Sequence, residues 1–257
     1  ASVLVGDSEQ TISCLGGSNY SEMDALADGH RRLESVKRRI AGIDPGNAQD
    51  YEGDIREEPI KWIGSRDVVT RNRFGTEVLN STSCVFVDID EPVFRIWQIF
   101  RRIRSRDERK QAILEFLARR FRKPDLGGFA IRVYETHSGV RLILEGPAAD
   151  PRSKESARLL RSFHADRLYA LLCRKQNCYR ARLTPKPHRI RMKPIRLRYP
   201  YDDETRKQVE AWVREYESKS EGFASCRLVQ VIGSAPDSLA VRYHDERARA
   251  ASALPLA

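Results

Sequence analysis

The sequence lacks any long apolar run. No stretch approaches the roughly 18 consecutive apolar residues of a membrane-spanning helix, and the start has no basic segment followed by a long apolar one, as a secretory signal would have. Apolar residues make up 40% and charged residues 32% of the 257, which is typical of a globular protein with a heavily ionised surface. We therefore expect a cytoplasmic protein without a membrane partner.

Cysteine is also scarce. The five cysteines are odd in number and scattered, so they do not form a disulfide framework, and free thiols fit a reducing compartment. Cys173 and Cys178 lie close in sequence to His164 and His188, but their spacing is not that of a zinc-binding C-x2-C pair, and there is no second cysteine pair. The sequence therefore predicts no structural zinc site.

Acidic residues are outnumbered by basic ones. The 46 Lys and Arg residues exceed the 36 Asp and Glu residues and give a net charge of +10, which favours an anionic partner such as nucleic acid or a nucleoside triphosphate. Residues 174–198 contain ten Lys or Arg and no acid, and three prolines keep them from forming a continuous helix. Phosphates are the natural counter-ions of such a run. Its candidate phosphate contacts are Arg180, Arg182, Lys186 and Arg189.

The basic run has two other interpretations. Acids elsewhere in the fold can pair with these arginines, or the run can be a solvated face. The sequence does not decide among the three.

Internal repeats and low-complexity tracts are absent as well. Residues 1–73 have little sustained periodicity and several turn formers, so we expect an N-terminal extension with one helix, roughly Ser21 to Ile40. We expect the core to span residues 74–200. A C-terminal helix and strands, residues 201–257, would pack on it.

Apolar periodicity within the core predicts a definite order of elements. Strands are expected at 84–90, 129–135, 140–145 and 178–183, and a last strand at 239–246. Helices are expected from Pro92 to about Arg122, with a break near Ser105, and over 151–173. The order β-α-β-β-α-β predicts an α+β protein with a ferredoxin-like or RNA-recognition-type (RRM-like) sheet.

Two acids end the first core strand. In Val85-Phe86-Val87-Asp88-Ile89-Asp90, period-two alternation points the carboxylates of Asp88 and Asp90 to one side. Two carboxylates so placed repel each other unless a cation lies between them, and Mg²⁺ or Mn²⁺ is the usual one. Alternatively, the acids only mark a strand end that enters solvent.

A hairpin turn adds further polar groups to this end of the sheet. In the expected topology the first and third strands are central antiparallel neighbours, so the two acids would face the turn that contains Thr136, His137 and Ser138, and also Arg141. His137 could contact a phosphate or donate a proton near the metal, or be idle. Asp245 is a candidate third metal ligand, in competition with Asp202, Asp203 and Asp237.

Three segments carry a family resemblance. The apolar strand that ends in the acid-x-acid pair, the hairpin segment 134–141 and the basic segment 180–187 together resemble the catalytic core of the archaeo-eukaryotic primase, or primase-polymerase, superfamily. The hairpin matches only in part, since His137 precedes Ser-Gly and Arg141 stands where a His is common, and the third family acid is not evident. Segments 132–136, 139–141 and 180–187 also resemble a group of uncharacterised bacterial proteins.

The resemblance implies a metal-dependent nucleotidyltransferase that joins nucleotides on a template. Asp88 and Asp90 would hold metals that bridge the triphosphate and the attacking 3′ hydroxyl. Phosphate charge in the transition state would be neutralised by Arg141, Arg182 and Lys186, and His137 would touch the incoming nucleotide.

Two other functions remain open. The first is a non-catalytic protein that binds single-stranded nucleic acid on the sheet and on residues 174–198. The second is a phosphatase of the haloacid dehalogenase class, whose D-x-D pair also ends an apolar strand. That fold needs a later acidic pair on a strand end, whereas the acids after Tyr201 open a helix, so it ranks third.

Overall fold

The chain divides into two compact units, Ala1–Arg56 and Glu57–Ala257. The structure is a computed structural model. It describes residues 2–5, 8–11, 16, 21–40, 57–90, 105–123, 126, 128–147, 150–196, 199–234 and 238–257. In the first unit, β1 (Ser2–Val5) and β2 (Ser8–Thr11) form an antiparallel pair. Helix α1 (Glu22–Ile40) confirms the helix expected there.

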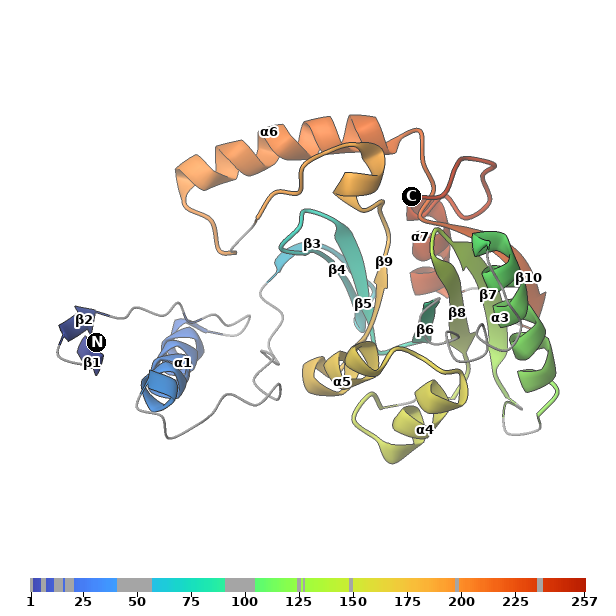
Figure 1. Ribbon diagram of the computed structural model, residues 1–257, viewed down its shortest axis with the longest axis horizontal. Helices are drawn as coiled ribbons and strands as arrows, with labels where there is room; N and C mark the ends of the chain where they lie inside the picture. Colours follow the sequence, from blue (N-terminus) through green and yellow to red (C-terminus); the bar gives the residue numbers. More distant parts are fainter. Residues whose placement is uncertain are drawn as a thin grey trace. The chain divides into compact units, whose positions relative to one another are not determined.

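The second unit contains two antiparallel four-stranded sheets (Figure 1). Sheet I has the order β10-β7-β8-β6 and sheet II the order β3-β4-β5-β9. The strands of sheet I are β6 (Val85–Asp90), β7 (Ala130–Thr136), β8 (Gly139–Glu145) and β10 (Cys226–Ile232). Those of sheet II are β3 (Glu58–Ile63), β4 (Asp67–Arg71), β5 (Glu77–Ser81) and β9 (Tyr179–Arg182).

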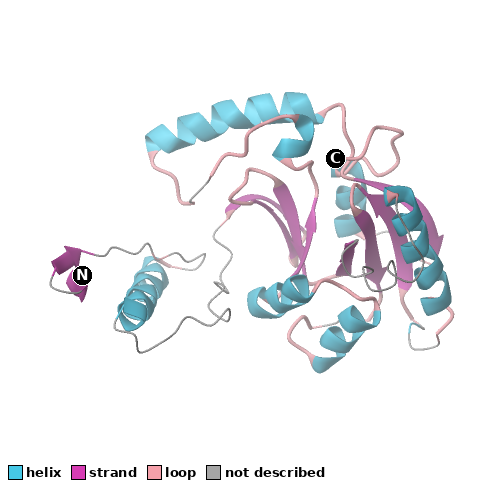
Figure 2. Ribbon diagram, in the orientation of Figure 1, coloured by secondary structure: helices cyan, strands magenta, loops and turns pink. Residues whose placement is uncertain are grey.

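Helices lie between and around the two sheets (Figure 2). They are α3 (Arg106–Arg120), α4 (Lys154–Ser162), α5 (Arg167–Gln176), the short 3₁₀ helix η4 (Pro187–Ile190), α6 (Asp203–Ser220) and α7 (Leu239–Arg247). No helix among the described residues is long and apolar enough to cross a membrane.

Helix α7 lies between the two sheets. On one side its His244 packs edge-on against Tyr134 of β7, and on the other it contacts β3 and β5 of sheet II. Helix α3 covers the opposite face of sheet I, because Lys110 of α3 bonds to Glu135, the neighbour of Tyr134, at 2.6 Å. Adjacent strand residues point to opposite faces. Any polar group between sheet I and α7 is therefore remote from α3.

The apolar core joins the two sheets. All seven residues of β8 and all five of β5 are buried, and one buried cluster runs from Leu79 and Ala181 in sheet II to Phe86 and Leu142 in sheet I. A smaller cluster under α6 contains Tyr216.

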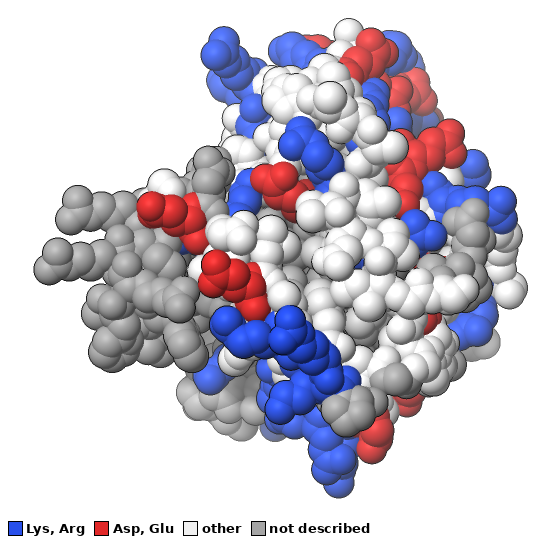
Figure 3. Space-filling model, turned by 90° about the vertical axis from the view of Figure 1, so that its right-hand side faces the viewer, with Lys and Arg blue, Asp and Glu red and all other residues white. Residues whose placement is uncertain are grey.

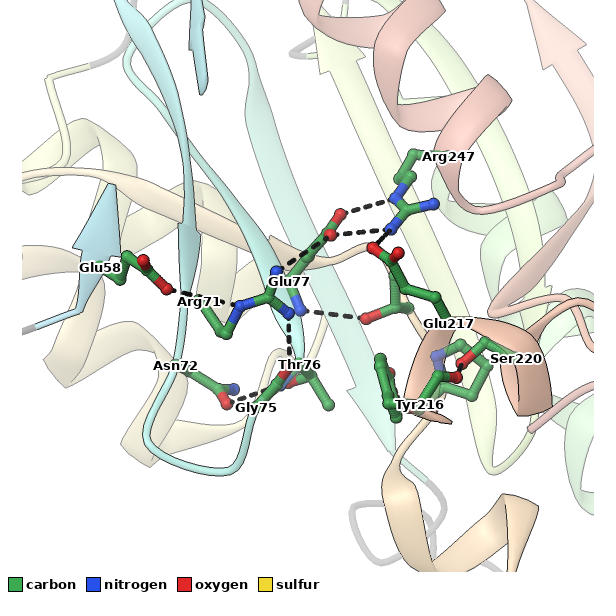
Figure 4. A network of polar contacts seen from close by, with 12 residues as sticks. Glu58, Arg71, Asn72, Gly75, Thr76, Glu77, Tyr216, Glu217, Ser220 and Arg247 are labelled. Atoms are coloured by element: carbon green, nitrogen blue, oxygen red, sulfur yellow. Dashed lines mark hydrogen bonds and ion pairs between the residues drawn. The ribbon is translucent and has the colours of Figure 1, made fainter. Parts of the chain in front are cut away.

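A buried carboxylate ties sheet II to helix α7 (Figure 4). Glu77 of β5, which is 4% exposed, accepts two hydrogen bonds from Arg247 of α7 at 2.6 and 2.7 Å. Arg71 of β4 lies 3.8 Å from the same carboxylate. Glu217 of α6 reaches Arg247 at 3.4 Å. A carboxylate this deeply buried needs such cations as partners.

The α+β class is confirmed, whereas the ferredoxin-like topology is not. The expected first and third strands, β6 and β8, are antiparallel neighbours as predicted. However, β6 lies at the edge of sheet I, and the expected fourth strand, β9, pairs with β5 in sheet II. Sheet II also contains two strands, β3 and β4, that precede residue 74. The expected boundary at residue 73 therefore falls inside this sheet.

Two expected elements differ in type or number. Residues 239–246 were expected as a strand, which is wrong: they form α7, whose N-cap Ser238 accepts a bond from the Val241 amide at 3.3 Å. Its buried residues Ala240, Val241 and His244 share one helical face. The single helix expected over 151–173 is divided into α4 and α5, with His164 between them at φ 55°. At Ser105 a capping box starts α3, and residues 91–104 lie outside the described residues.

Candidate functional site

The structure brings the end of β6 next to the β7–β8 hairpin, as the sequence predicted. In the β6–β8 register Asp88 lies opposite Arg141 and Asp90 opposite Gly139. The structure describes the backbone of Asp90 but not its side chain. The acid-x-acid segment and the hairpin turn, about fifty residues apart in the sequence, thus lie at one end of sheet I.

Asp88 is held by an arginine. Arg141 Nε donates to Asp88 Oδ1 at 2.7 Å and Arg141 Nη2 donates to Oδ2 at 3.1 Å. The Arg141 side chain is 3% exposed and that of Asp88 33%. Burial by itself would raise the pKa of Asp88, but the adjacent guanidinium lowers it below its usual value. Both oxygens of this carboxylate therefore already have a cationic partner.

A chain of polar groups continues from Arg141 into helix α7. Arg141 Nη1 donates to the Arg182 carbonyl at 2.8 Å and lies 3.4 Å from His244 Nε2. His244 Nδ1 lies 2.9 Å from Asp245 Oδ1. Because Asp245 can only accept and Arg141 can only donate, His244 carries its proton on Nδ1 and accepts on Nε2.

The same chain ends at Tyr134, whose hydroxyl donates to Asp245 Oδ1 at 2.7 Å. His244 is completely buried, and burial lowers its pKa, so it is neutral at pH 7. We name Asp88, Arg141, His244, Asp245 and Tyr134 the central polar chain. The central polar chain lies between sheet I and α7, and each of its side chains has at least one polar partner within it.

This arrangement bears on the expected metal ligands. Asp88 and Asp245 are held by different donors, with Arg141 and His244 between them in the chain of contacts. Among the residues that the structure describes, no group of three or more His, Cys, Asp or Glu is arranged to hold a metal ion. The binding of Mg²⁺ or Mn²⁺ by Asp88, Asp90 and Asp245 thus stays a prediction. Of the competing acids, Asp202 caps α6 by accepting from the Thr205 amide at 2.7 Å, and Asp237 lies outside the described residues.

The hairpin turn contacts the basic segment and the chain's last residues. Arg189 Nη2 donates to Ser138 Oγ at 2.9 Å. His137 Nδ1 donates to the Leu256 carbonyl at 3.0 Å. Thr136 ends β7 opposite Cys226. The predicted hairpin residues and Arg189 thus belong to one neighbourhood.

Arg182 differs from the other described basic residues of segment 174–198. Its Nε is buried and has no hydrogen-bond partner in the part of the chain that the structure describes. Burial and the neighbouring cations Arg141 and Arg189 lower its pKa to about 10, although Asp88 acts in the opposite direction. Arg182 as a whole is half-buried, and a guanidinium with two cationic neighbours and one carboxylate neighbour favours an added anion.

A second residue reports the same positive potential. The pKa of His188 is lowered by desolvation and by the cations Arg189, Lys186 and Arg182. We name Arg182, Lys186, His188 and Arg189, together with Ser138, the anion cluster. Because like charges so close together are unfavourable, an anionic ligand would stabilise the cluster.

Arg180 does not belong to the anion cluster. Its guanidinium donates to Glu57 Oε2 at 2.5 Å and to Gln176 Oε1 at 3.1 Å. Arg180 thus matches the second interpretation of the basic run, in which an acid elsewhere in the fold pairs with an arginine of the run. Sequence reasoning could not find Glu57, which lies more than a hundred residues away and belongs to a segment without clear periodicity.

Sequence reasoning also missed two residues of the central polar chain. Tyr134 looks like an ordinary strand residue, and His244 was placed on a strand. The one available signal was the adjacent His244-Asp245 pair, since a histidine beside a carboxylate is a frequent polar unit.

Comparisons with known proteins add no further assignment. No protein-family model matches the chain, and neither a curated protein nor a solved structure matches it.

Proposed function

We propose that this protein binds single-stranded nucleic acid through the phosphate groups of the strand, with Arg182 as the central contact. The observation that carries this proposal is the buried Arg182 Nε without a partner among the described residues, beside two further arginines. An N–H group of arginine and a phosphate oxygen form a charge-assisted hydrogen bond, which is stronger than a neutral one. Such a contact would satisfy the buried donor and offset the surplus charge.

Net charge by itself does not support this site. Figure 3 shows one face of the molecule, on which acidic side chains lie among the basic ones. Positive charge is therefore not continuous over that face, and the proposal depends on the local surplus at the anion cluster. A cytoplasmic location, where nucleic acid is plentiful, belongs to the same proposal.

The proposal is tested by fluorescence anisotropy with a short labelled single-stranded RNA and the matching DNA. Arg182→Gln should weaken binding about tenfold, which corresponds to about 1.4 kcal/mol. Arg119→Gln is the matched control, because Arg119 is exposed on α3, which covers the other face of sheet I. Equal affinities of the two variants would end the proposal.

A second candidate is metal-dependent nucleotidyl transfer of the primase-polymerase type. The observation in its favour is the placement of Asp88 and the backbone of Asp90 beside the hairpin that contains His137. In this candidate a cation competes with Arg141 for Asp88, and the family's RRM-like sheet is part of the proposal. Purified protein with Mn²⁺, a primed template and labelled nucleotides should extend the primer, and Asp88→Asn should not. Extension that survives this substitution excludes the candidate.

A further inference from the structure

One face of sheet II has an exposed aromatic ring at its β3 edge and buried polar groups, Thr70 and Asn80, at its centre. The strand registers place Trp62 opposite Val68, Val68 opposite Asn80, and Asn80 opposite Arg180. Residues directly opposite one another in a sheet point to the same face. Trp62, at the β3 edge, is 67% exposed. These opposed residues form a row that has an exposed aromatic ring at one end and a guanidinium at the other.

The middle of this row has an unsatisfied acceptor. Asn80 Nδ2 donates to the Val68 carbonyl at 3.1 Å and to Thr70 Oγ1 at 2.9 Å. The carbonyl cannot donate, so the amide orientation is fixed. Asn80 is only 3% exposed, and its Oδ1 has no partner within the described ranges. A donor group that gains access to this buried oxygen would satisfy it.

A carboxylate of the chain itself occupies the cationic end. Glu57 Oε2 accepts both from Thr70 Oγ1 and from Arg180 Nη2, each at 2.5 Å. A hydroxyl and a guanidinium that converge on one oxygen are the donor pair that also suits a phosphate oxygen. Glu57 is the first residue of the second unit and directly precedes β3.

We infer that Glu57 holds the place of a nucleic-acid phosphate on sheet II and competes with it. When Glu57 leaves, Thr70 and Arg180 bind a phosphate of a single strand that crosses the sheet toward β3, and Trp62 stacks on one of its bases. This inference rests on the proposed function, because it extends the strand's path from the anion cluster. Arg182 and Arg180 are alternate residues of β9 and therefore point to the same side of it.

Two adjacent glutamates provide a matched pair of variants. Glu57 bonds to Thr70, whereas Glu58 lies 3.6 Å from Arg71. Thr70 and Arg71 are neighbours in β4 and point to opposite faces. Glu57→Gln and Glu58→Gln therefore change the net charge equally but affect different faces of sheet II.

The test measures the affinity of the 257-residue chain for labelled single-stranded RNA. Glu57→Gln should tighten binding by about tenfold if Glu57 fills the site nine-tenths of the time, and Glu58→Gln by less than about twofold. Trp62→Ala should weaken binding by about fivefold or more. The double variant Glu57→Gln, Arg180→Gln should lose the gain.

The outcomes separate this inference from the proposed function. If Arg182→Gln weakens binding but Glu57→Gln and Glu58→Gln bind alike, the competition by Glu57 is refuted and the anion cluster stands. If Arg182→Gln has no effect, both fail. Partial unfolding would weaken binding, so it cannot mimic the tighter binding expected of Glu57→Gln. Thermal melting of each variant checks that the protein is folded under the conditions of the assay.

Discussion

At the scale of single residues, the contact between Asp88 and Arg141 determines what the acid-x-acid segment can do. A carboxylate with both oxygens bonded to a buried guanidinium is a structural anchor in this state. The same guanidinium also bonds to the Arg182 backbone and faces His244. Arg141 therefore links sheet I, β9 and α7.

Removing this guanidinium should cost stability. Arg141→Gln leaves Asp88 without its cation, and we expect the free energy of unfolding to fall by about 3 kcal/mol, the low end for a buried pair, because Asp88 is 33% exposed. Urea denaturation measures this change. The control is Arg227→Gln, because the Arg227 side chain is 40% exposed, lies 3.7 Å from Glu135 and donates to the Leu254 carbonyl at 3.0 Å. Its loss should cost about 1 kcal/mol. Equal losses would contradict the assigned role of Arg141.

His244 should make stability depend on pH. Its pKa is lowered in the folded state by burial, while in the unfolded chain it is about 6.5. Below that pH the unfolded chain binds a proton that the folded protein does not, so stability falls as the pH drops below about 6.5, by up to about 1.4 kcal/mol per pH unit. Denaturation of the wild type and of His244→Gln between pH 7.5 and 5.5 should show a smaller loss for the variant. Parallel profiles would contradict this prediction.

At the scale of elements, the sequence predicted local structure better than strand partners. The hairpin β7–β8 and the strand β6 are evident because their residues alternate or are uniformly apolar. Strand β3 was missed because four of its six residues are exposed, which gives no apolar pattern. Without β3, β4 and β5 as a recognised sheet, β9 had no visible partner except β6. The expected pairing of β9 with β6 was therefore wrong because sheet II had not been recognised.

Helix α7 illustrates a tertiary effect on local preference. The segment Leu239-Ala240-Val241 followed by Tyr243 is compatible with a strand. In the structure the Ser238 cap and burial between two sheets favour the helix, and propensity alone is a weak guide in such a place. The consequence for the site was large, because helical spacing places His244 and Asp245 within the central polar chain.

The attachment of α7 to sheet II can be tested at Glu77. Glu77→Gln leaves Arg247 and Arg71 without a buried anion and should lower the free energy of unfolding by about 3 to 5 kcal/mol. The control Glu217→Gln removes a half-exposed partner of the same Arg247 and should cost less than about 1 kcal/mol. Chemical denaturation of both variants checks the difference. A loss in Glu77→Gln no larger than in the control would contradict the anchoring role.

At the scale of the whole molecule, composition indicates the kind of partner proposed here but not where on the fold it would bind. The net charge of +10 and the acid-free run 174–198 indicated phosphate. The fold then divided that run, because Arg180 pairs with Glu57 whereas Arg182 lies among cations. This difference depends on which side chains surround each arginine in the folded protein. Counting charges along the sequence does not reveal it.

Salt dependence tests the local site against the general charge. The logarithm of the affinity for single-stranded nucleic acid should fall linearly with the logarithm of salt concentration, with a slope of about −0.7 for each phosphate neutralised. Arg182→Gln should reduce the magnitude of that slope by about 0.7, and Arg119→Gln should leave it unchanged. A slope that changes equally in both variants would indicate binding by net charge alone.

The central claim is that Arg182 Nε–H bonds to a phosphate, and its ¹H–¹⁵N resonance reports this directly. Arg182→Lys assigns the signal by its loss. On titration with a short single-stranded RNA, we expect the resonance to shift and its exchange with water to slow, because the hydrogen bond protects the proton. A resonance that stays in place while the same RNA saturates the protein would contradict the claim.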